Sequence, residues 1–286
     1  YQTNQNEAPI VSQTQEFTYF EDAKTTMRTI AESEDWEKLN NDSSGPLINR
    51  ASQGLYTPGS TFKILTMAAA LESGNTSLLD RFYCGGHSIV DGQKIKCWKT
   101  IGHGSQELTE GLVNSCNCVF MALAQRMGTD KFYSYLKGFG LGSKTGVQIA
   151  SESNGILMNQ KLVKNVDLAR IGFGQAVAVT PLQLVTAVSC AVNGGYLYKP
   201  SIINKTTSFD NKLLSINSNL EKSKVISNQT SNTINQMLKK VVNKTQEYSF
   251  VEGYDVGGKT GTAQKYQDGQ ISRGKYISSF IGTYPA

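Results

Sequence analysis

A serine and a lysine near the start of an apolar helix are the first residues in this chain that suggest chemistry. Residues 57–74 read TPGSTFKILTMAAALESG, which places Ser60 and Lys63 three positions apart. Positions i and i+3 share one helix face, so we expect the hydroxyl and the amine to meet. A lysine is unfavourable at the positive N-terminal end of a helix, but burial near other cations lowers its pKa. Ser60 is therefore a candidate nucleophile, with Lys63 as its base.

A second hydroxyl occurs with an amide in the stretch GLVNSCNCVF, as Ser115-Cys116-Asn117. Residues i and i+2 do not face each other on a helix. This stretch therefore works best as a short connection between helices, from which Ser115 and Asn117 can both project into a cleft.

The third motif, residues 257–263, reads GGKTGTA. In a strand, Thr260 and Thr262 lie on the same face and can both donate to a carboxylate. Gly261 between them lets a ligand backbone approach closely, and Lys259 adds the positive charge that a terminal carboxylate requires. The motif predicts a carboxylate site on a strand.

The elements that must position these residues can be predicted from periodicity and from glycine and proline signals. Residues 1–45 form a polar segment, residues 46–200 are mostly helical, and residues 201–225 are strands or loops. Helices are predicted at 22–39, 60–73, 119–127, 131–138, 181–192 and 230–242. A hairpin is predicted from 254–264 and 275–284, with its turn at 267–269. A helical block with a late antiparallel sheet is an α+β arrangement.

Composition narrows the class of protein. The chain has 286 residues, 39% of them hydrophobic, which fits a globular protein. Its net charge of +5 is spread along the chain without clusters of lysine and arginine, which argues against a nucleic-acid partner. It has no signal peptide and no run of about 18 apolar residues. The five cysteines, an odd number, exclude a fully paired disulfide framework.

Serine-x-x-lysine, serine-x-asparagine and lysine-threonine-glycine, in that order, form the signature of penicillin-recognising serine acyltransferases. Over residues 46–286 the chain resembles the transpeptidase domain of class B penicillin-binding proteins, and within that class the stage V sporulation protein D group. The supporting stretches are KIKCWKTIGHGSQELTEGLVNSCN, IGFGQAVAVTPLQLVTAVSCAVNGG, VGGKTGTAQ and GKYISSFIGTYPA. The resemblance implies a penicillin-binding protein/serine β-lactamase-like α+β fold, a helical subdomain plus an antiparallel sheet whose C-terminal part is truncated here. Residues 1–45 stay unassigned.

The resemblance also implies a role for each motif residue. Ser60 would be the acylated nucleophile, Lys63 its base, and Ser115 the relay that protonates the leaving amine. Asn117 would hold the peptide backbone of the substrate. Lys259, Thr260 and Thr262, with Gly261 between them, would bind its terminal carboxylate, and the backbone N–H groups of Ser60 and Thr262 would form an oxyanion hole.

The implied function is a serine D,D-transpeptidase that cross-links peptidoglycan stem peptides and is acylated by β-lactams, with a role in sporulation. The alternatives are a D,D-carboxypeptidase or β-lactamase, a β-lactam sensor, and a serine-x-x-lysine glutaminase. Cys116 argues against a β-lactamase, since class A enzymes carry aspartate there. The resemblance further implies the extracytoplasmic face of the membrane of the cell or the forming spore, an N-terminal anchor helix outside this chain, and a membrane glycosyltransferase partner.

A second lysine-threonine-glycine, Lys144-Thr145-Gly146, lies only about thirty residues after Ser115 and is followed by valine and glutamine. We interpret it as a glycine-rich turn, and Lys259 as the functional lysine.

Cys84, His87 and Cys97 form a cluster that the catalytic motifs do not explain. Cys-x-x-His on a turn with a third soft ligand predicts a structural zinc site. The fourth ligand could be Asp80, Asp91 or His103, and Asp80 is preferred. A Cys84–Cys97 disulfide and two reduced thiols in a packed loop are the alternatives.

Overall fold

The computed structural model describes residues 48–149, 151–216, 222–245, 250–267 and 270–285. The predicted helix at 22–39 and nearly all of the polar N-terminal segment lie outside the described residues. Residues Asn49–Ala286 form one compact unit. Within the described residues, no helix combines the length and the apolar character needed to cross a membrane.

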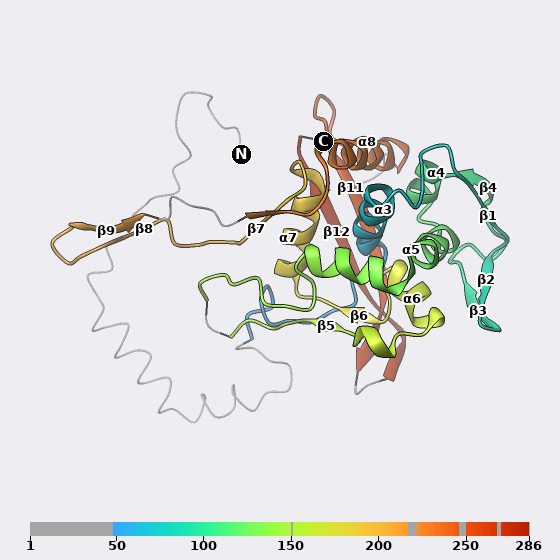
Figure 1. Cartoon of the computed structure of the whole chain (residues 1–286), viewed down its shortest axis with the longest axis horizontal. Helices are drawn as coiled ribbons and strands as arrows, with labels where there is room; N and C mark the ends of the chain where they lie inside the picture. The colour runs from blue at the N-terminus through green and yellow to red at the C-terminus, as the bar shows by residue number, and fades with distance from the viewer. Residues whose placement is uncertain (1–47, 150, 217–221, 246–249, 268–269, 286) are drawn as a thin grey trace. The chain divides into compact units, whose positions relative to one another are not determined.

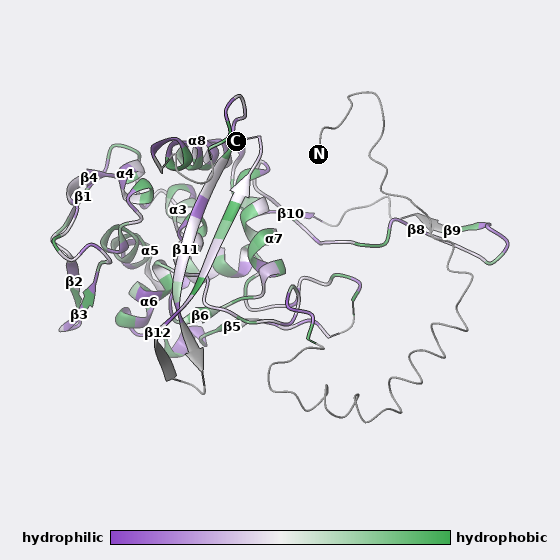
Figure 2. Ribbon diagram, turned by 180° about the vertical axis from the view of Figure 1, so that it is seen from behind, coloured by the Kyte–Doolittle hydropathy of each residue, from purple (hydrophilic) through white to green (hydrophobic). Residues whose placement is uncertain are grey.

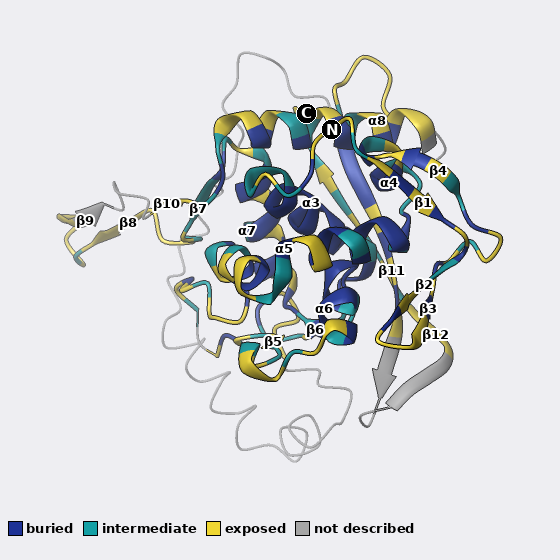
Figure 3. Ribbon diagram, turned by 45° about the vertical axis from the view of Figure 1, so that its right-hand side comes forward, coloured by how far each residue is buried: buried dark blue, intermediate teal, exposed yellow. Residues whose placement is uncertain are grey.

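A buried helix occupies the middle of this unit (Figure 3). The chain enters it through a 3-10 turn, η1 (Gly59–Phe62), and continues as α3 (Lys63–Glu72). All side chains from Lys63 to Ala70 are buried, because α5 (Asn117–Gly138), α7 (Pro181–Val192) and α8 (Asn228–Thr245) all pack against α3. The helix ends at Glu72 with Ser73 as its C-cap. Gly74 follows with a φ of 68°, the stop signal that the sequence predicts.

The other helices surround α3 (Figure 1). The two helices predicted at 119–127 and 131–138 form α5, interrupted at Gly128, where φ is 73°. The helix predicted at 181–192 is confirmed as α7 and is mostly hydrophobic (Figure 2). The helix predicted at 230–242 lies within α8. Two short helices, α4 (Leu108–Val113) and α6 (Asn165–Gly172), and the 3-10 turn η2 (Gln160–Leu162) complete the set among the described residues.

The predicted hairpin is confirmed as β11 (Gly257–Gln267) and β12 (Gln270–Thr283). The strands are antiparallel, with Thr260 opposite Phe280 and Thr262 opposite Ser278. β11 packs against both α8 and η1, which places the third sequence motif beside the first. Two residues of the predicted turn, Asp268 and Gly269, lie outside the described residues.

The expectation of a mostly helical stretch up to residue 200 is wrong between residues 81 and 107. This segment folds as two small antiparallel pairs, β1 (Arg81–Cys84) with β4 (Gly104–Glu107) and β2 (His87–Val90) with β3 (Gln93–Lys96). In β1, exposed and buried residues alternate, which is the period of a half-buried strand. Four residues are too short a window to establish that period in the sequence.

Three further antiparallel pairs lie elsewhere in the described chain: β5 (Ile156–Leu157) with β6 (Val177–Ala178), β7 (Tyr196–Tyr198) with β10 (Lys222–Lys224), and β8 (Lys205–Thr207) with β9 (Leu213–Ile216). β8, β9 and β10 lie within 201–225, where the sequence predicts strands or loops. The architecture is α+β, as expected.

Candidate active site

Ser60 lies in η1 on the wall of a cavity of about 720 Å³. In a 3-10 turn, residues i and i+3 are aligned, so Lys63 follows Ser60 on the same side. Gly59 has a φ of 57°, and a Cβ atom there would lie 2.9 Å from the carbonyl oxygen of Thr262. Glycine before the serine therefore lets η1 pack directly against β11.

The amino group of Lys63 connects the first motif to the second. Lys63 is fully buried, and its Nζ donates to the Ser115 carbonyl at 2.7 Å, the Ser115 hydroxyl at 3.1 Å and Asn117 Oδ1 at 2.8 Å. All three acceptors are neutral. Burial, and after it the charge of Lys259, lowers the pKa of Lys63 to about 7. Near neutral pH, a large fraction of Lys63 is therefore uncharged and able to take a proton.

Ser115 lies on the short connection between α4 and α5, as the sequence predicts, whereas Asn117 is the first residue of α5. Ser115 ends α4 with a φ of 51°, a left-handed conformation that helix ends usually give to glycine. Its N–H donates to the Leu112 carbonyl at 3.0 Å, and the next N–H donates to Gly111 at 2.9 Å. Strained residues of this kind concentrate at functional sites. In this conformation the Ser115 hydroxyl accepts the hydrogen bond from Lys63.

Trp98 holds this connection from outside. Its indole N–H donates to the carbonyls of Asn114 and Ser115, both at 3.1 Å, and its ring lines the cavity. Sequence reasoning did not identify Trp98 as a site residue. The feature that could have identified Trp98 is the KCW tripeptide, which lies within one of the stretches that carry the family resemblance.

The third motif lies across the cavity. Thr260 and Thr262 are exposed in β11 and line it, while Lys259 is 2% exposed and also reaches it. Burial lowers the pKa of Lys259 to about 8. Lys259 Nζ donates to the Thr260 carbonyl at 3.2 Å. The cavity thus brings together residues of all three motifs: Ser60, then Ser115 and Asn117, and then Lys259, Thr260 and Thr262.

Gly261 makes room for the chain's own backbone. A Cβ atom there would lie 2.8 Å from the Pro58 carbonyl and 2.6 Å from Ser279 Oγ. The sequence-based hypothesis assigned this room to a ligand, whereas the structure fills it with these two neighbours. Gly174, which sequence reasoning missed, has a similar role: its φ is 84°, and a Cβ atom would lie 1.9 Å from the Gly59 carbonyl.

The second lysine-threonine-glycine binds a carboxylate of its own. Glu152 accepts hydrogen bonds from the backbone N–H groups of Thr145 at 2.8 Å and Gly146 at 3.0 Å, and also from the Thr145 hydroxyl. Gly146 has a φ of 79°, as a turn requires. The turn interpretation agrees with this geometry, because the chain itself occupies the motif.

The protein-family model described as the penicillin-binding protein transpeptidase domain matches residues 17–286 of this chain. The chain belongs to this family. It is 48% identical over 234 residues to stage V sporulation protein D of Bacillus subtilis, which covers 81% of this chain and 36% of that protein. It is 30% identical over 279 residues to peptidoglycan D,D-transpeptidase MrdA of Acinetobacter baumannii, covering 88% and 41%. The chain thus spans less than half the length of these curated relatives.

Solved structures agree with the fold. Penicillin-binding protein 3 from Mycobacterium tuberculosis, complexed with ampicillin, superposes with a TM-score of 0.78 at 28% identity, covering 86% of this chain and 56% of that one. The transpeptidase domain of penicillin-binding protein 3 from Burkholderia pseudomallei gives 0.73 at 26% identity, covering 83% and 69%. The family and fold expected from the three motifs are confirmed.

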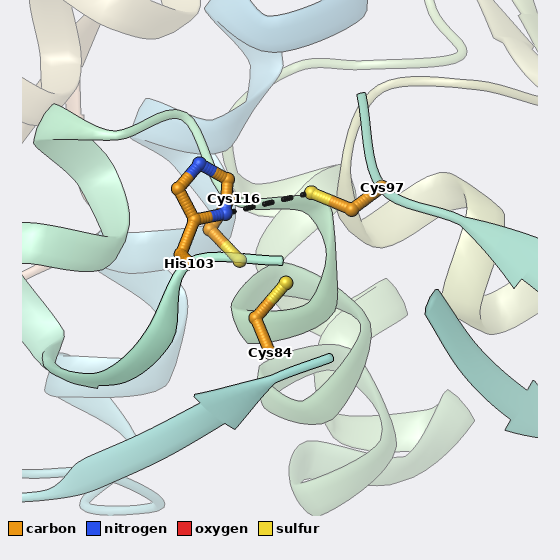
Figure 4. A group of neighbouring side chains, drawn as sticks. All are labelled: Cys84, Cys97, His103 and Cys116. Carbon is orange, nitrogen blue, oxygen red and sulfur yellow. Dashed lines mark hydrogen bonds between the residues drawn. The ribbon is translucent and has the colours of Figure 1, made fainter. Parts of the chain in front are cut away.

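This transpeptidase domain also contains a cysteine–histidine group next to the second motif (Figure 4). One potential ligand atom from each of Cys84, Cys97, His103 and Cys116 lies within 4.8 Å of the others. Cys97 Sγ lies 3.8 Å from His103 Nδ1. A tetrahedral zinc ion with Zn–S bonds of about 2.3 Å needs sulfur atoms about 3.8 Å apart. The donor set and its compactness therefore fit zinc.

The group shares two members with the predicted set, Cys84 and Cys97, and includes His103, one of the residues left open for the fourth position. His103 joins because the β1–β4 pairing places Cys84 opposite Gly104. His87 begins β2 opposite Lys96 instead and is not in the group.

Asp80 is also outside the group. Its carboxylate accepts from the hydroxyls of Thr76 and Ser77 and pairs with Arg126 at 2.7 Å. Asp91, the remaining candidate, accepts from Asn165 at 3.2 Å.

All five cysteines are buried and free. Hydrogen bonds from Cys116 and then Cys118 hold the pKa of the Cys97 thiol well below its usual range. A thiolate is the form of cysteine that binds metal, so this environment favours a ligand at Cys97.

Proposed function

We propose that this domain is a serine D,D-transpeptidase that cross-links peptidoglycan stem peptides. Ser60 attacks the penultimate carbonyl of a donor ending in D-Ala-D-Ala, while neutral Lys63 takes the hydroxyl proton. Ser115 passes a proton to the leaving D-alanine amine, and an ester forms on Ser60. An acceptor amine then attacks this ester, an amide forms, and Ser60 regains its proton. The observation that carries this proposal is the buried Lys63 amine hydrogen-bonded to both Ser115 and Asn117.

The cavity walls support the remaining roles. Lys259 supplies the charge, and Thr260 and Thr262 supply the hydroxyls, that a donor's terminal carboxylate needs. Asn117 holds the donor backbone. The close packing of Gly59 on the Thr262 carbonyl supports an oxyanion hole in which the backbone N–H groups of Ser60 and Thr262 stabilise the tetrahedral oxyanion.

The relatives support the biological setting. One is named a stage V sporulation protein, another a peptidoglycan D,D-transpeptidase, and a third is complexed with ampicillin. We therefore assign the domain to cell-wall synthesis during sporulation and to acylation by β-lactams. We place it on the extracytoplasmic side of the cell or forming-spore membrane, in a longer protein with an N-terminal anchor, beside a membrane glycosyltransferase.

The test uses a D-Ala-D-Ala peptide with and without an amine acceptor, followed by mass spectrometry. We expect a cross-linked product that grows with acceptor concentration, together with a β-lactam adduct that lasts for hours. Hydrolysis unaffected by the acceptor would instead indicate a carboxypeptidase, and an adduct that clears within seconds would indicate a β-lactamase. A stable adduct without peptide turnover would indicate a sensor, and the absence of an adduct on folded protein would contradict all of these readings.

We further propose that Cys84, Cys97, His103 and Cys116 hold a structural zinc ion. Cys116 is the middle residue of the second motif, and Cys97 directly precedes Trp98, whose indole holds the Ser115 carbonyl. A metal there fixes the α4–α5 connection, while the chemistry at Ser60 proceeds on protein groups alone.

Removal of this zinc should loosen the active site. We expect protein purified under reducing conditions to contain about one zinc ion, and Cys84→Ser to contain none and to lose at least about 5 °C in Tm. Cys190→Ser is the matched control, since Cys190 is equally buried in α7 but outside the group. Zinc-supplied wild type without bound metal, or with a Tm unchanged by chelation, would contradict the site.

A further inference from the structure

The cavity beside Ser60 carries positive charge without a carboxylate. Among the described residues that line it, Lys244 and Lys259 are the charged ones, and no aspartate or glutamate is present. In the proposed reaction Lys259 binds the donor's terminal carboxylate. Lys244 has no part in that reaction as stated.

Lys244 is held at the cavity by neutral groups. It lies in the last turn of α8, and its Nζ donates to Asn114 Oδ1 at 3.4 Å. The Asn114 amide in turn donates to Gln106 Oε1 at 3.1 Å, and Gln106 is 2% exposed. This partly buried contact orients the Asn114 amide, whose oxygen accepts from Lys244. An amide oxygen orients the ammonium group without neutralising its charge, and no carboxylate among the described residues forms an ion pair with it.

Another lysine of the same helix shows the contrast. Lys239 pairs with the carboxylate of Asp255, away from the cavity. Lys244 has no carboxylate beside it among the described residues that line the cavity. A cation in this position attracts an anionic ligand.

The position of Lys244 indicates which ligand. Asn114 directly precedes Ser115, the residue that protonates the leaving amine in the proposed reaction. The acceptor amine attacks from the side on which the leaving amine departs, because the second step reverses the first. A group bound to Asn114 therefore lies beside the incoming acceptor strand.

We propose that Lys244 is a specificity-determining residue that binds a side-chain carboxylate of the acceptor peptide, distinct from the carboxylate at Lys259. The inference rests on the proposed transpeptidation and deepens it. The preferred acceptor is an anionic peptide whose free carboxylate lies next to the residue bearing the amine, and amidation of that carboxylate weakens its use.

The test compares two acceptor peptides that differ only in glutamate or glutamine beside the amine-bearing residue. The readout is the ratio of cross-linking rates for the two acceptors with one neutral donor. In wild type we expect the glutamate acceptor to be favoured about threefold to fivefold, the range of an exposed ion pair. Lys244→Met should bring the ratio to about one, and Lys244→Glu should reverse it.

Lys240→Glu is the matched control, because it makes the same charge change one turn away on α8, at an exposed residue outside this cavity. Its ratio should equal that of wild type. A ratio unchanged in both Lys244 variants would overturn the inference. So would a rate that responds to the Lys244 variants only when glutamate and glutamine are exchanged in the donor peptide, and not in the acceptor. Wild type that forms no acyl-enzyme would instead overturn the proposed function, before any acceptor is compared.

Discussion

Ser60→Ala should abolish acylation, with a loss of at least about 10⁴-fold in the rate of adduct formation with a β-lactam. The reason is that the alanine variant has no oxygen to form the ester, while every other group of the cavity stays in place. Intact mass after incubation measures the result directly: wild type gains one drug mass, and the variant gains none.

Ser115→Ala is the control for this experiment, because it removes another hydroxyl from the same cavity. It should still form the adduct, but about 10²- to 10³-fold more slowly, since a proton relay contributes general acid–base catalysis and not the bond itself. A full-mass adduct on Ser60→Ala at the wild-type rate would show that another residue is acylated. Peptide mapping of that adduct would then identify the nucleophile.

Motifs and elements that depend on residues close together in the chain could be predicted from the sequence. Ser60 and Lys63 are separated by one helical turn, and the glycine after α3 marks its end, so both the motif and its helix follow from short-range spacing. The same holds for α7, which begins with proline and ends before Asn193-Gly194, and for the alternating hydroxyls of β11. Each of these elements is specified by residues within it or directly beside it.

Features that depend on pairing between distant segments could not be predicted. The choice of His103 over His87 depends on the β1–β4 register, and neither four-residue strand has a pattern strong enough to reveal it. The contact of Trp98 with Ser115 joins residues 17 positions apart, and Gly174 meets Gly59 across more than a hundred. In the sequence, a glycine needed for such a contact looks like any other turn glycine.

The largest effect after loss of the nucleophile should come from Lys63→Met. Methionine fills much of the same buried volume but cannot accept a proton, so the acylation rate should fall by about 10²- to 10⁴-fold. Stopped-flow acylation with a chromogenic β-lactam measures this loss. Lys239→Met, which removes a lysine of α8 outside the cavity, is the matched control and should acylate like wild type.

The pH dependence of wild type gives a sharper test of the base. Lys63 is effective when neutral, and its pKa of about 7 makes the acylation rate fall about tenfold per pH unit below that value. Lys259 is effective when charged, and its pKa of about 8 makes the rate fall again above it. The expected profile is a narrow bell, and Lys259→Arg, which keeps its charge, should lose the alkaline side only.

The same pKa predicts a stability effect that is independent of activity. Between pH 7 and 10.5 the unfolded chain carries a proton on Lys63 that the folded chain has released. The free energy of unfolding should therefore rise with pH across this window, relative to that of Lys63→Met. Denaturant titrations of both proteins at several pH values measure the difference. Parallel stability curves would mean that Lys63 keeps its ordinary pKa in the folded protein. In that case Lys63→Met would remove a positive charge from the active site and not a base.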